Sequence, residues 1–446
     1  MLSPYEVVMW TLLGTGFGVL LSWIPGFHIY NLMALIMITY PVFMEVPESF
    51  PFFALGALVA FVYLSILPSV YLSVADESLI LMLFPTQRYL VLGRGHEAVW
   101  LSLLGAVGGS IILVILGLTV IPVILPPLYL LFSPYITWIL LAIVVFMFLS
   151  EWLKAGDREK TPSRRLWVAW QQSLGGIFVF LAAGLLGFFV MNTGFVPAKF
   201  AYVRLTPMFI GFFGMPWVLQ NILSRRHIPR QDTRDKIEAS MFGIANGTIA
   251  GAFGGYIAAF FPIVTGGMGA LVAGHMASSR GDDVFIVSQG ANRVLYYVGA
   301  FFLLFVPTAR LTRGAGAWLV SSIYTPKTWI EFYYAAGAIL LAAGISFIST
   351  IYMSKLLARI LTQMNYVKLS YVVAVLLAII TYLLADIPGL IVLAVATIIG
   401  LASVVFNTRR SYCLGGLIFP VLISMTGQTG TLLQFFGLTP QALMGG

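Results

Sequence analysis

Two interrupted apolar stretches carry the residue types best suited to binding a small ion. In the first, an apolar, glycine-spaced segment over residues 14–21 is followed by a break at Pro25-Gly26. Proline removes a backbone donor and glycine allows unusual dihedral angles, so one helix ends there and another can begin. A helix that begins after Gly26 would present free N–H groups and a positive dipole end to an anion. The side chains beside this predicted helix start are Phe27, His28 and Asn31.

The second half of the chain contains a similar break. An apolar segment that begins at Gly247-Thr248 is interrupted at Pro262. Freed backbone groups inside a membrane must face protein, water or a ligand, and two interrupted segments in corresponding places indicate the binding site of a transporter. The alternative for each break is a kinked helix whose small residues pack against another helix. The candidate binding residues here are Pro262, Thr265, Gly266 and Gly267.

A polar interruption at residues 288–293 lies inside another apolar stretch. Ionisable side chains are costly at membrane depth, so their presence needs a purpose. We predict that Asn292 coordinates substrate or ion and that Arg293 binds a carboxylate. The alternative for Arg293 is a position near the interface, from which its side chain reaches water.

Acidic pairs follow both breaks and could bind a coupling cation or relay protons. Pairs of this kind also occur as solvated loop ends, and that alternative stays open. The candidate residues are Asp76, Glu77, Asp282 and Asp283.

The composition places these residues in a membrane protein. The chain has 446 residues, of which 60% are hydrophobic and 9% are charged, whereas soluble domains carry roughly 25% charged residues. The formal net charge of +8 fits basic loops on the inner side of a membrane better than a nucleic-acid surface. Cys413 is the only cysteine, which excludes disulfides within the chain and cysteine-rich metal sites.

We therefore expect an all-α polytopic membrane protein with about 10–12 transmembrane segments. Two shorter apolar pieces, residues 29–43 and 264–277, are more typical of re-entrant than of spanning segments. The basic loops 154–170 and 225–236 should be cytoplasmic, with the chain in the plasma membrane. Apolar candidates begin near residues 6, 52, 97, 135, 174, 206, 238, 284, 331, 369, 388 and 414.

Short matches recur in the same order in both halves, which predicts a duplicated architecture. The first repeat would cover residues 1–224, a basic linker 225–236, and the second repeat 237–446, and we favour inverted repeats that bind near the membrane midplane. The matched pairs are Gly14-Thr15-x-x-Gly18 with Gly247-Thr248-x-x-Gly251, Arg94-Gly95 with Arg313-Gly314, Asn192-Thr193 with Asn407-Thr408, and Gly211-x4-Pro216 with Gly415-x4-Pro420.

Enzyme signatures are missing from the sequence. It has no G-x-x-x-x-G-K-[ST] loop, no H-E-x-x-H and no G-x-S-x-G, and its four histidines have no metal-ligand spacing. We predict no enzymatic activity, no cofactor, no catalytic residue and no metal site. An intramembrane hydrolase that uses the aspartate pairs is the alternative.

Several segments together resemble the large permease subunit of tripartite tricarboxylate transporters, the TctA family, and more closely its archaeal-type branch. They run across nearly the whole chain. The segments are residues 14–26 with their Pro-Gly, 76–98 (DESLILMLFPTQRYLVLGRGHEA), 205–216 (LTPMFIGFFGMP), 288–292, 313–315 and 409–420.

The resemblance implies a multi-span secondary permease for organic acids such as di- and tricarboxylates. It places the family's Pro-Gly element on Pro25 and Gly26 and its asparagine on Asn292. The first break departs from the family pattern, since PGFHIYN replaces a glycine-rich loop, and Arg293 replaces a small polar residue.

The function predicted is a secondary active transporter for a small organic anion, coupled to a proton or sodium gradient. The alternatives are a translocase of a lipid-linked phosphate, such as polyprenyl phosphate, and a membrane scaffold that transports nothing. Besides the anion, the cation (H⁺ or Na⁺) and the lipid bilayer, the resemblance implies a small membrane subunit and an extracytoplasmic binding protein as partners. We also allow for a homodimer and expect no nucleic acid.

Overall fold

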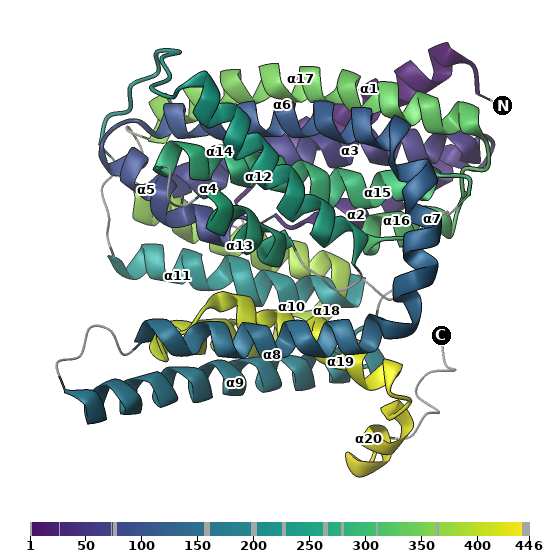
Figure 1. Cartoon of the computed structure of the whole chain (residues 1–446). Helices are drawn as coiled ribbons and strands as arrows, with labels where there is room; N and C mark the ends of the chain where they lie inside the picture. The colour runs from purple at the N-terminus through teal and green to yellow at the C-terminus, as the bar shows by residue number, and fades with distance from the viewer. Residues whose placement is uncertain are drawn as a thin grey trace. The chain divides into compact units, whose positions relative to one another are not determined.

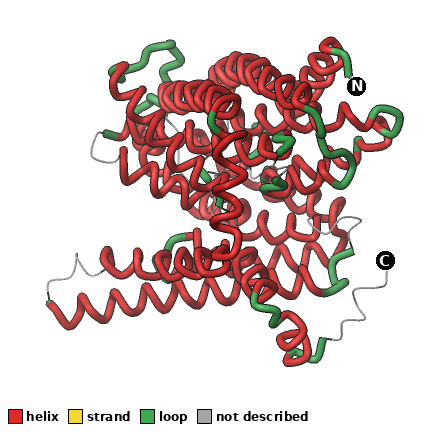
Figure 2. Tube along the Cα trace, turned by 45° about the vertical axis from the view of Figure 1, so that its right-hand side comes forward, coloured by secondary structure: helices red, strands yellow, loops and turns green. Residues whose placement is uncertain are grey.

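The computed structural model consists of helices and the turns between them, with no strand in the part of the chain that it describes (Figure 2). The predicted all-α class is confirmed. The structure describes residues 2–25, 27–72, 74, 78–155, 161–197, 203–224, 229–261, 266–277, 281–308, 311–361, 363 and 365–438.

The first half of the chain contains eleven α-helices and six shorter 3-10 or π turns among its described residues. They are α1 (Pro4–Leu21), α2 (Ile29–Ile38), η1 (Tyr40–Phe43), η2 (Pro47–Ser49), α3 (Phe50–Leu64), α4 (Ile66–Leu72), η3 (Ile80–Met82), α5 (Leu83–Val91), α6 (Gly95–Thr119), α7 (Ile121–Phe132), η4 (Ser133–Tyr135), α8 (Ile136–Ala155), α9 (Pro162–Asn192), η5 (Val203–Leu205), α10 (Thr206–Phe209), the π-helix η6 (Ile210–Gly214) and α11 (Met215–Ser224).

The second half continues with elements of the same kinds. They are α12 (Met241–Phe260), α13 (Gly266–Ala277), α14 (Asp282–Arg293), the π-helix η8 (Val294–Gly299), α15 (Ala300–Phe302), η9 (Leu303–Phe305), α16 (Gly314–Ser321), α17 (Trp329–Leu361), α18 (Tyr366–Val405), η10 (Arg410–Leu414), α19 (Gly415–Met425) and α20 (Thr429–Phe435).

Seven helices are long and apolar enough to cross a membrane, or eight if the bent pair α19 and α20 is counted as one span. These numbers refer to the described residues and are lower than the 10–12 predicted. The stretches near 206 and 284 are divided by π-helices into short pieces. The candidates near 369 and 388 are the two helical parts of α18, which meet at a kink where Asp386 has non-helical dihedral angles (φ 55°), just before Pro388.

The helices form two compact units, and each unit takes a segment from each half of the chain. Unit 1 contains residues 1–132 and 221–373, and unit 2 contains residues 133–220 and 374–446. In unit 1, α1, α3, α6 and α17 run side by side (Figure 1). In unit 2, α8 packs on α9, and α9 packs on α19.

Glycines let two helix pairs in unit 1 approach backbone to backbone. A Cβ on Gly14 would overlap the carbonyl of Phe53 in α3, and one on Gly18 would lie 2.6 Å from Ala57 O. The same holds between α12 and α14, where a Cβ on Gly251 would overlap the carbonyl of Ser288. The repeated Gly-Thr-x-x-Gly sequence is therefore a helix-packing motif in both halves.

Helices of one half also pack against helices of the other half, in a reciprocal pattern. In unit 1, α6 packs on α14 and α12, while α17 packs on α3 and α1, and α6 and α17 contact each other. Gly105 and Gly290 make the first of these contacts close, since a Cβ on either would overlap a carbonyl of the facing helix. The contacts correspond when α1 is matched with α12, α3 with α14 and α6 with α17. Two repeats related by a twofold axis would show this correspondence.

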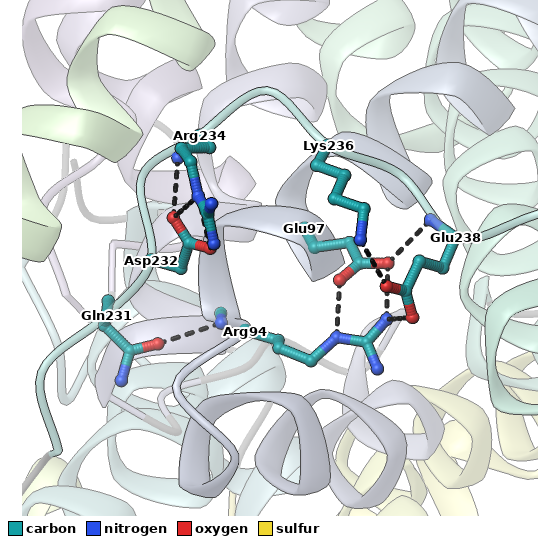
Figure 3. Close-up of polar contacts among 8 residues, drawn as sticks. Arg94, Glu97, Gln231, Asp232, Arg234, Lys236 and Glu238 are labelled. Atoms are coloured by element: carbon teal, nitrogen blue, oxygen red, sulfur yellow. Dashed lines mark hydrogen bonds and ion pairs between the residues drawn. The ribbon is translucent and has the colours of Figure 1, made fainter.

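The segment that joins the two halves is fastened to the start of α6 (Figure 3). Gln231 accepts a hydrogen bond from Gly95 N at 2.8 Å, which satisfies one free N–H at the beginning of the helix. Arg94 forms two hydrogen bonds to Glu97, at 2.6 and 2.7 Å, and one to Glu238 at 2.9 Å. Glu97 in turn accepts from Glu238 N. The basic linker is thus ordered by acidic and amide partners over residues 229–240.

A second set of contacts ties the linker to α17. Asp235 pairs with Lys355 at 2.6 Å and accepts from Trp100 at 3.0 Å. His96, which is fully buried, contacts Asp235 through Nε2 and Ser354 through Nδ1. The Lys355 and His96 hydrogen bonds lower the pKa of Asp235 to about 2. A lowered carboxyl pKa means that these contacts stabilise the fold at neutral pH and are lost as the pH falls toward that value.

The first prediction concerns the close approach of α12 to α14. Gly251→Ala should destabilise the protein by about 1–3 kcal/mol, because the new methyl group has no space beside Ser288. Gly337→Ala is the matched control, since a Cβ on this exposed glycine of α17 meets no atom within 4 Å. The control should be neutral or slightly stabilising, because alanine favours the helix. Thermal unfolding in detergent measures both, and equal effects would contradict the packing argument.

The second prediction concerns the linker. Asp235→Asn should increase amide hydrogen exchange over residues 229–240, because the contacts to Lys355 and His96 are weakened. Asp232→Asn is the control, since Asp232 pairs with Arg234 inside the linker itself. Exchange measured by mass spectrometry should leave the control close to wild type. Similar exchange in the two variants would show that Asp235 does not hold the linker.

Candidate binding site at the helix breaks

The first predicted break is a non-helical turn between α1 and α2. Helix α1 ends at Leu21, where Ser22 Oγ donates to Gly18 O at 2.6 Å. Two turn hydrogen bonds follow, from Ile24 N to Leu21 O and from Phe27 N to Ile24 O. Pro25 lies in this turn and is partly exposed, and Gly26 lies outside the described residues.

The start of α2 carries three predicted site residues in buried positions. The His28 carbonyl accepts hydrogen bonds from Asn31 N at 2.9 Å and Leu32 N at 3.2 Å, so it forms the first turn of the helix. Phe27 and His28 are buried, and Asn31 is fully buried. Neither Nδ2 nor Oδ1 of Asn31 has a hydrogen-bond partner. A buried polar group without a partner costs free energy, so the Asn31 amide is suited to a ligand.

The second break separates α12, which ends at Phe260, from α13, which begins at Gly266. Gly266 is buried and Gly267 is half-buried. Two predicted site residues at this break, Pro262 and Thr265, lie outside the described residues. So do the acidic candidates Asp76 and Glu77.

Asn292 faces the start of α13. Its Nδ2 donates to Gly266 O at 3.1 Å, whereas its Oδ1 has no hydrogen-bond partner. Gly269 makes this approach possible, because a Cβ there would lie 2.6 Å from Oδ1. Asn292 is fully buried, as Asn31 is at the other break.

Gln289 repeats this arrangement one turn earlier on α14, and it is absent from the predicted site. Its Nε2 donates to Ala270 O at 3.2 Å, and its Oε1 is buried without a partner. The sequence signal for it was its spacing of three residues from Asn292, which places both amides on one face of the helix.

Arg293 is buried, with 1% of its surface exposed, and its guanidinium is held by the protein. Nε donates to Ser78 Oγ at 2.9 Å, Nη1 to Val62 O at 2.7 Å and Nη2 to Ser65 Oγ at 2.6 Å. The side chain does not reach the surface of the molecule, in contrast to the interfacial alternative. These contacts join α14 to the junction of α3 and α4, and a role in anion binding stays a prediction.

The acidic pair of the second half lies away from Asn292. Asp282 and Asp283 form the first turn of α14, about 15 Å along the helix from Asn292. Asp282 pairs with Arg88 at 3.0 Å, and the Arg88 side chain is well exposed while that of Asp282 is partly exposed. This geometry fits the solvated alternative for Asp282. The described residues contain no group of three or more metal-ligating side chains.

Comparison with known proteins decides the family. The family model described as Tripartite tricarboxylate transporter TctA family matches residues 8–415. The chain belongs to the TctA family. The resemblance read from the sequence is confirmed, and the chain is a permease of the tricarboxylate-transporter type and a multi-pass membrane protein. Because TctA is a transporter family, the prediction that the chain is not an enzyme is also confirmed.

A relative of unknown function shares most of the length of this TctA protein. It is an uncharacterized protein of Methanocaldococcus jannaschii, 22% identical over 426 residues, which cover 93% of this chain and 98% of the relative. No solved structure matches the chain. The TctA family is the large membrane subunit of tripartite transporters, which is compatible with a small membrane subunit and a binding protein as partners.

The third prediction separates a structural role of Arg293 from a substrate role. Arg293→Met should destabilise the protein by about 2 kcal/mol or more, because it removes three buried hydrogen bonds that the guanidinium donates. Arg88→Met, which removes an exposed pair, should change stability by less than about 0.5 kcal/mol. Thermal unfolding without any organic anion is the measurement. An Arg293→Lys variant with wild-type stability and lost citrate binding would contradict the structural role.

Proposed function

We propose that this TctA protein is a secondary active transporter for a small organic anion, a di- or tricarboxylate, driven by a proton or sodium gradient. One observation carries the proposal. Each of the two helix breaks has a fully buried asparagine whose side-chain oxygen lacks a hydrogen-bond partner, Asn31 at the first and Asn292 at the second. Such groups are retained where a ligand completes their hydrogen bonding.

The two breaks offer complementary chemistry to an anion and a cation. The N-terminal ends of α2 and α13 lie at the two breaks, and the positive end of each helix dipole favours a carboxylate. Asn31 can donate through Nδ2 as well as accept through Oδ1. The free oxygens of Asn292 and Gln289 can accept from a substrate hydroxyl or bind a cation such as Na⁺.

The presence of one helix break in each half agrees with the reciprocal packing of the two halves. We propose that residues 1–224 and 237–446 are inverted repeats joined by the linker 225–236. The reciprocal packing of α6 on α14 and of α17 on α3 supports this proposal. Transporters built from such repeats bind substrate near the midplane, at the repeat interface.

The location and the partners proposed for this transporter follow from its family and from the positions of its basic loops. The basic loops 154–170 and 225–236 face the cytoplasm, and the membrane is the plasma membrane. A small membrane subunit and an extracytoplasmic binding protein are the proposed partners, and a homodimer is the proposed assembly.

The fourth prediction tests the asparagines in proteoliposomes. Initial uptake of labelled citrate, succinate and malate should depend on an imposed sodium or proton gradient. Asn31→Ala and Asn292→Ala should each reduce uptake of the preferred anion about tenfold or more, the loss expected for one hydrogen bond to a charged group.

Asn246→Ala is the matched control for both variants. Asn246 lies on α12, where its Nδ2 donates to Phe242 O within the same helix. The control should transport at a rate near wild type, and size-exclusion chromatography should show all three variants folded. Uptake that survives collapse of both gradients, or an equal rate in all variants, would overturn the proposed function.

A further inference from the structure

Unit 2 contains a group of buried polar atoms that lack hydrogen-bond partners and take no part in the helix breaks. All of them can donate a hydrogen bond, and two belong to arginines. Within the described residues of this unit they are Ser173 Oγ, Arg204 Nε, Thr206 Oγ1, Trp217 Nε1 and Arg410 Nη1.

Arg410 has the greatest need of a hydrogen-bond partner in this group, because its charge is buried. It is 6% exposed, and its Cζ lies 4.2 Å from the centre of the Trp217 ring. No carboxylate pairs with Arg410 in the part of the chain that the structure describes. Its environment differs from that of Arg293, where Nε, Nη1 and Nη2 each donate to an oxygen.

The indole ring does not complete the environment of Arg410. A guanidinium over an aromatic face gains cation–π attraction, but its N–H groups point outward in its own plane. Those donors need acceptors, and a buried charge without them is strongly destabilising. An oxyanion is the partner whose geometry matches the edge of a guanidinium.

The elements that carry other donors of this group are linked to η10 by packing contacts within unit 2. Arg410 begins η10, while Arg204 lies in η5 and Thr206 begins α10. Both η5 and η10 pack against α9, which carries Ser173, and η10 also packs against η6.

Arg204, Thr206 and Arg410 also occupy related positions just before the repeated Gly-x4-Pro segments of the two halves. The pair Gly211 and Gly415 is offset by 415 − 211 = 204 residues, and the same offset relates Arg204 to Thr408 and Thr206 to Arg410. An arginine and a threonine two residues apart therefore precede the Gly-x4-Pro segment in each half, in opposite order. Each half thus contributes to unit 2 one arginine of this pattern, Arg204 from the first half and Arg410 from the second.

We propose that Arg410 and Trp217 form the core of an anion site in unit 2, and that Thr206, Ser173 and Arg204 contribute further donors to it. The site would take one carboxylate or phosphate group. The ligand's oxygens would accept from Arg410 Nη1 and Trp217 Nε1 while the guanidinium stays on the ring. This inference goes beyond the proposed function, because none of these residues lies at the helix breaks.

The fifth prediction tests this site with the full-length protein in detergent. Citrate and inorganic phosphate are titrated by calorimetry, and co-purified lipids are identified by native mass spectrometry. Arg410→Gln should weaken binding of the anion about tenfold or more, as expected for lost hydrogen bonds to a charged group. Trp217→Phe keeps the ring and removes the N–H donor, so a smaller loss is expected. Arg409→Gln, which removes the neighbouring, partly exposed arginine, should leave binding unchanged.

The outcomes also identify the source of the anion. Citrate or phosphate binding that depends on Arg410 indicates a soluble anion, whereas an anionic lipid retained by wild type and lost from Arg410→Gln indicates a lipid headgroup. If Arg410→Gln does not fold, Trp217→Phe and Thr206→Val provide the test. Absence of all three ligands from the wild type, or binding unchanged in Arg410→Gln and Trp217→Phe, would overturn the proposal. Binding lost only in Asn31→Ala or Asn292→Ala would concern the helix breaks instead.

Discussion

Close approach of helix backbones at glycine is the constraint on which unit 1 depends. Gly14 and Gly18 seat α1 on α3, and Gly247 and Gly251 seat α12 on α14. In a membrane the lipid tails are as apolar as the side chains, so association relies on tight van der Waals packing and hydrogen bonds more than on the hydrophobic effect. Small residues therefore hold the helices of this protein together, as large apolar residues do in the core of a soluble protein. Helix α1 ends at Leu21, shortly after its packed glycines.

The repeated glycine motif shows how far the sequence could be interpreted. Its two proposed meanings, helix packing and a binding break, both describe this stretch, but they apply to different residues. Gly14 and Gly18 pack, and the non-helical turn follows from Ser22 onward. Hydropathy and proline positions were sufficient for the helical class and for this break. Within the described residues they predicted more long spans than the structure has, in part because apolar composition does not reveal where a π-helix will divide a segment.

The polar groups were harder to predict, because their partners are distant in the sequence. Arg293 bonds to Val62 and Ser65, more than 200 residues away, and no local pattern announces that contact. Arg410 was missed for the same reason, since an unpartnered atom is defined by what surrounds it in space. Gln289 had a local signal in its spacing from Asn292, but its unpartnered oxygen is likewise a property of the packing. Asn292 was found because it interrupts an apolar stretch, which is a local signal. Its hydrogen bond to Gly266 depends on tertiary packing.

The exchange of helices between the halves has a consequence for how the chain is made. Gly105 on α6 is shaped to meet α14, and Gln231 and Ser354 satisfy polar groups at the start of α6. During synthesis α6 enters the membrane before any of these partners exists. The glycine face of α6 therefore reaches its final packing only after the second half, including α17, has been inserted. We therefore expect that the two halves of this permease complete their packing together, and that neither half is fully packed before the other has been made.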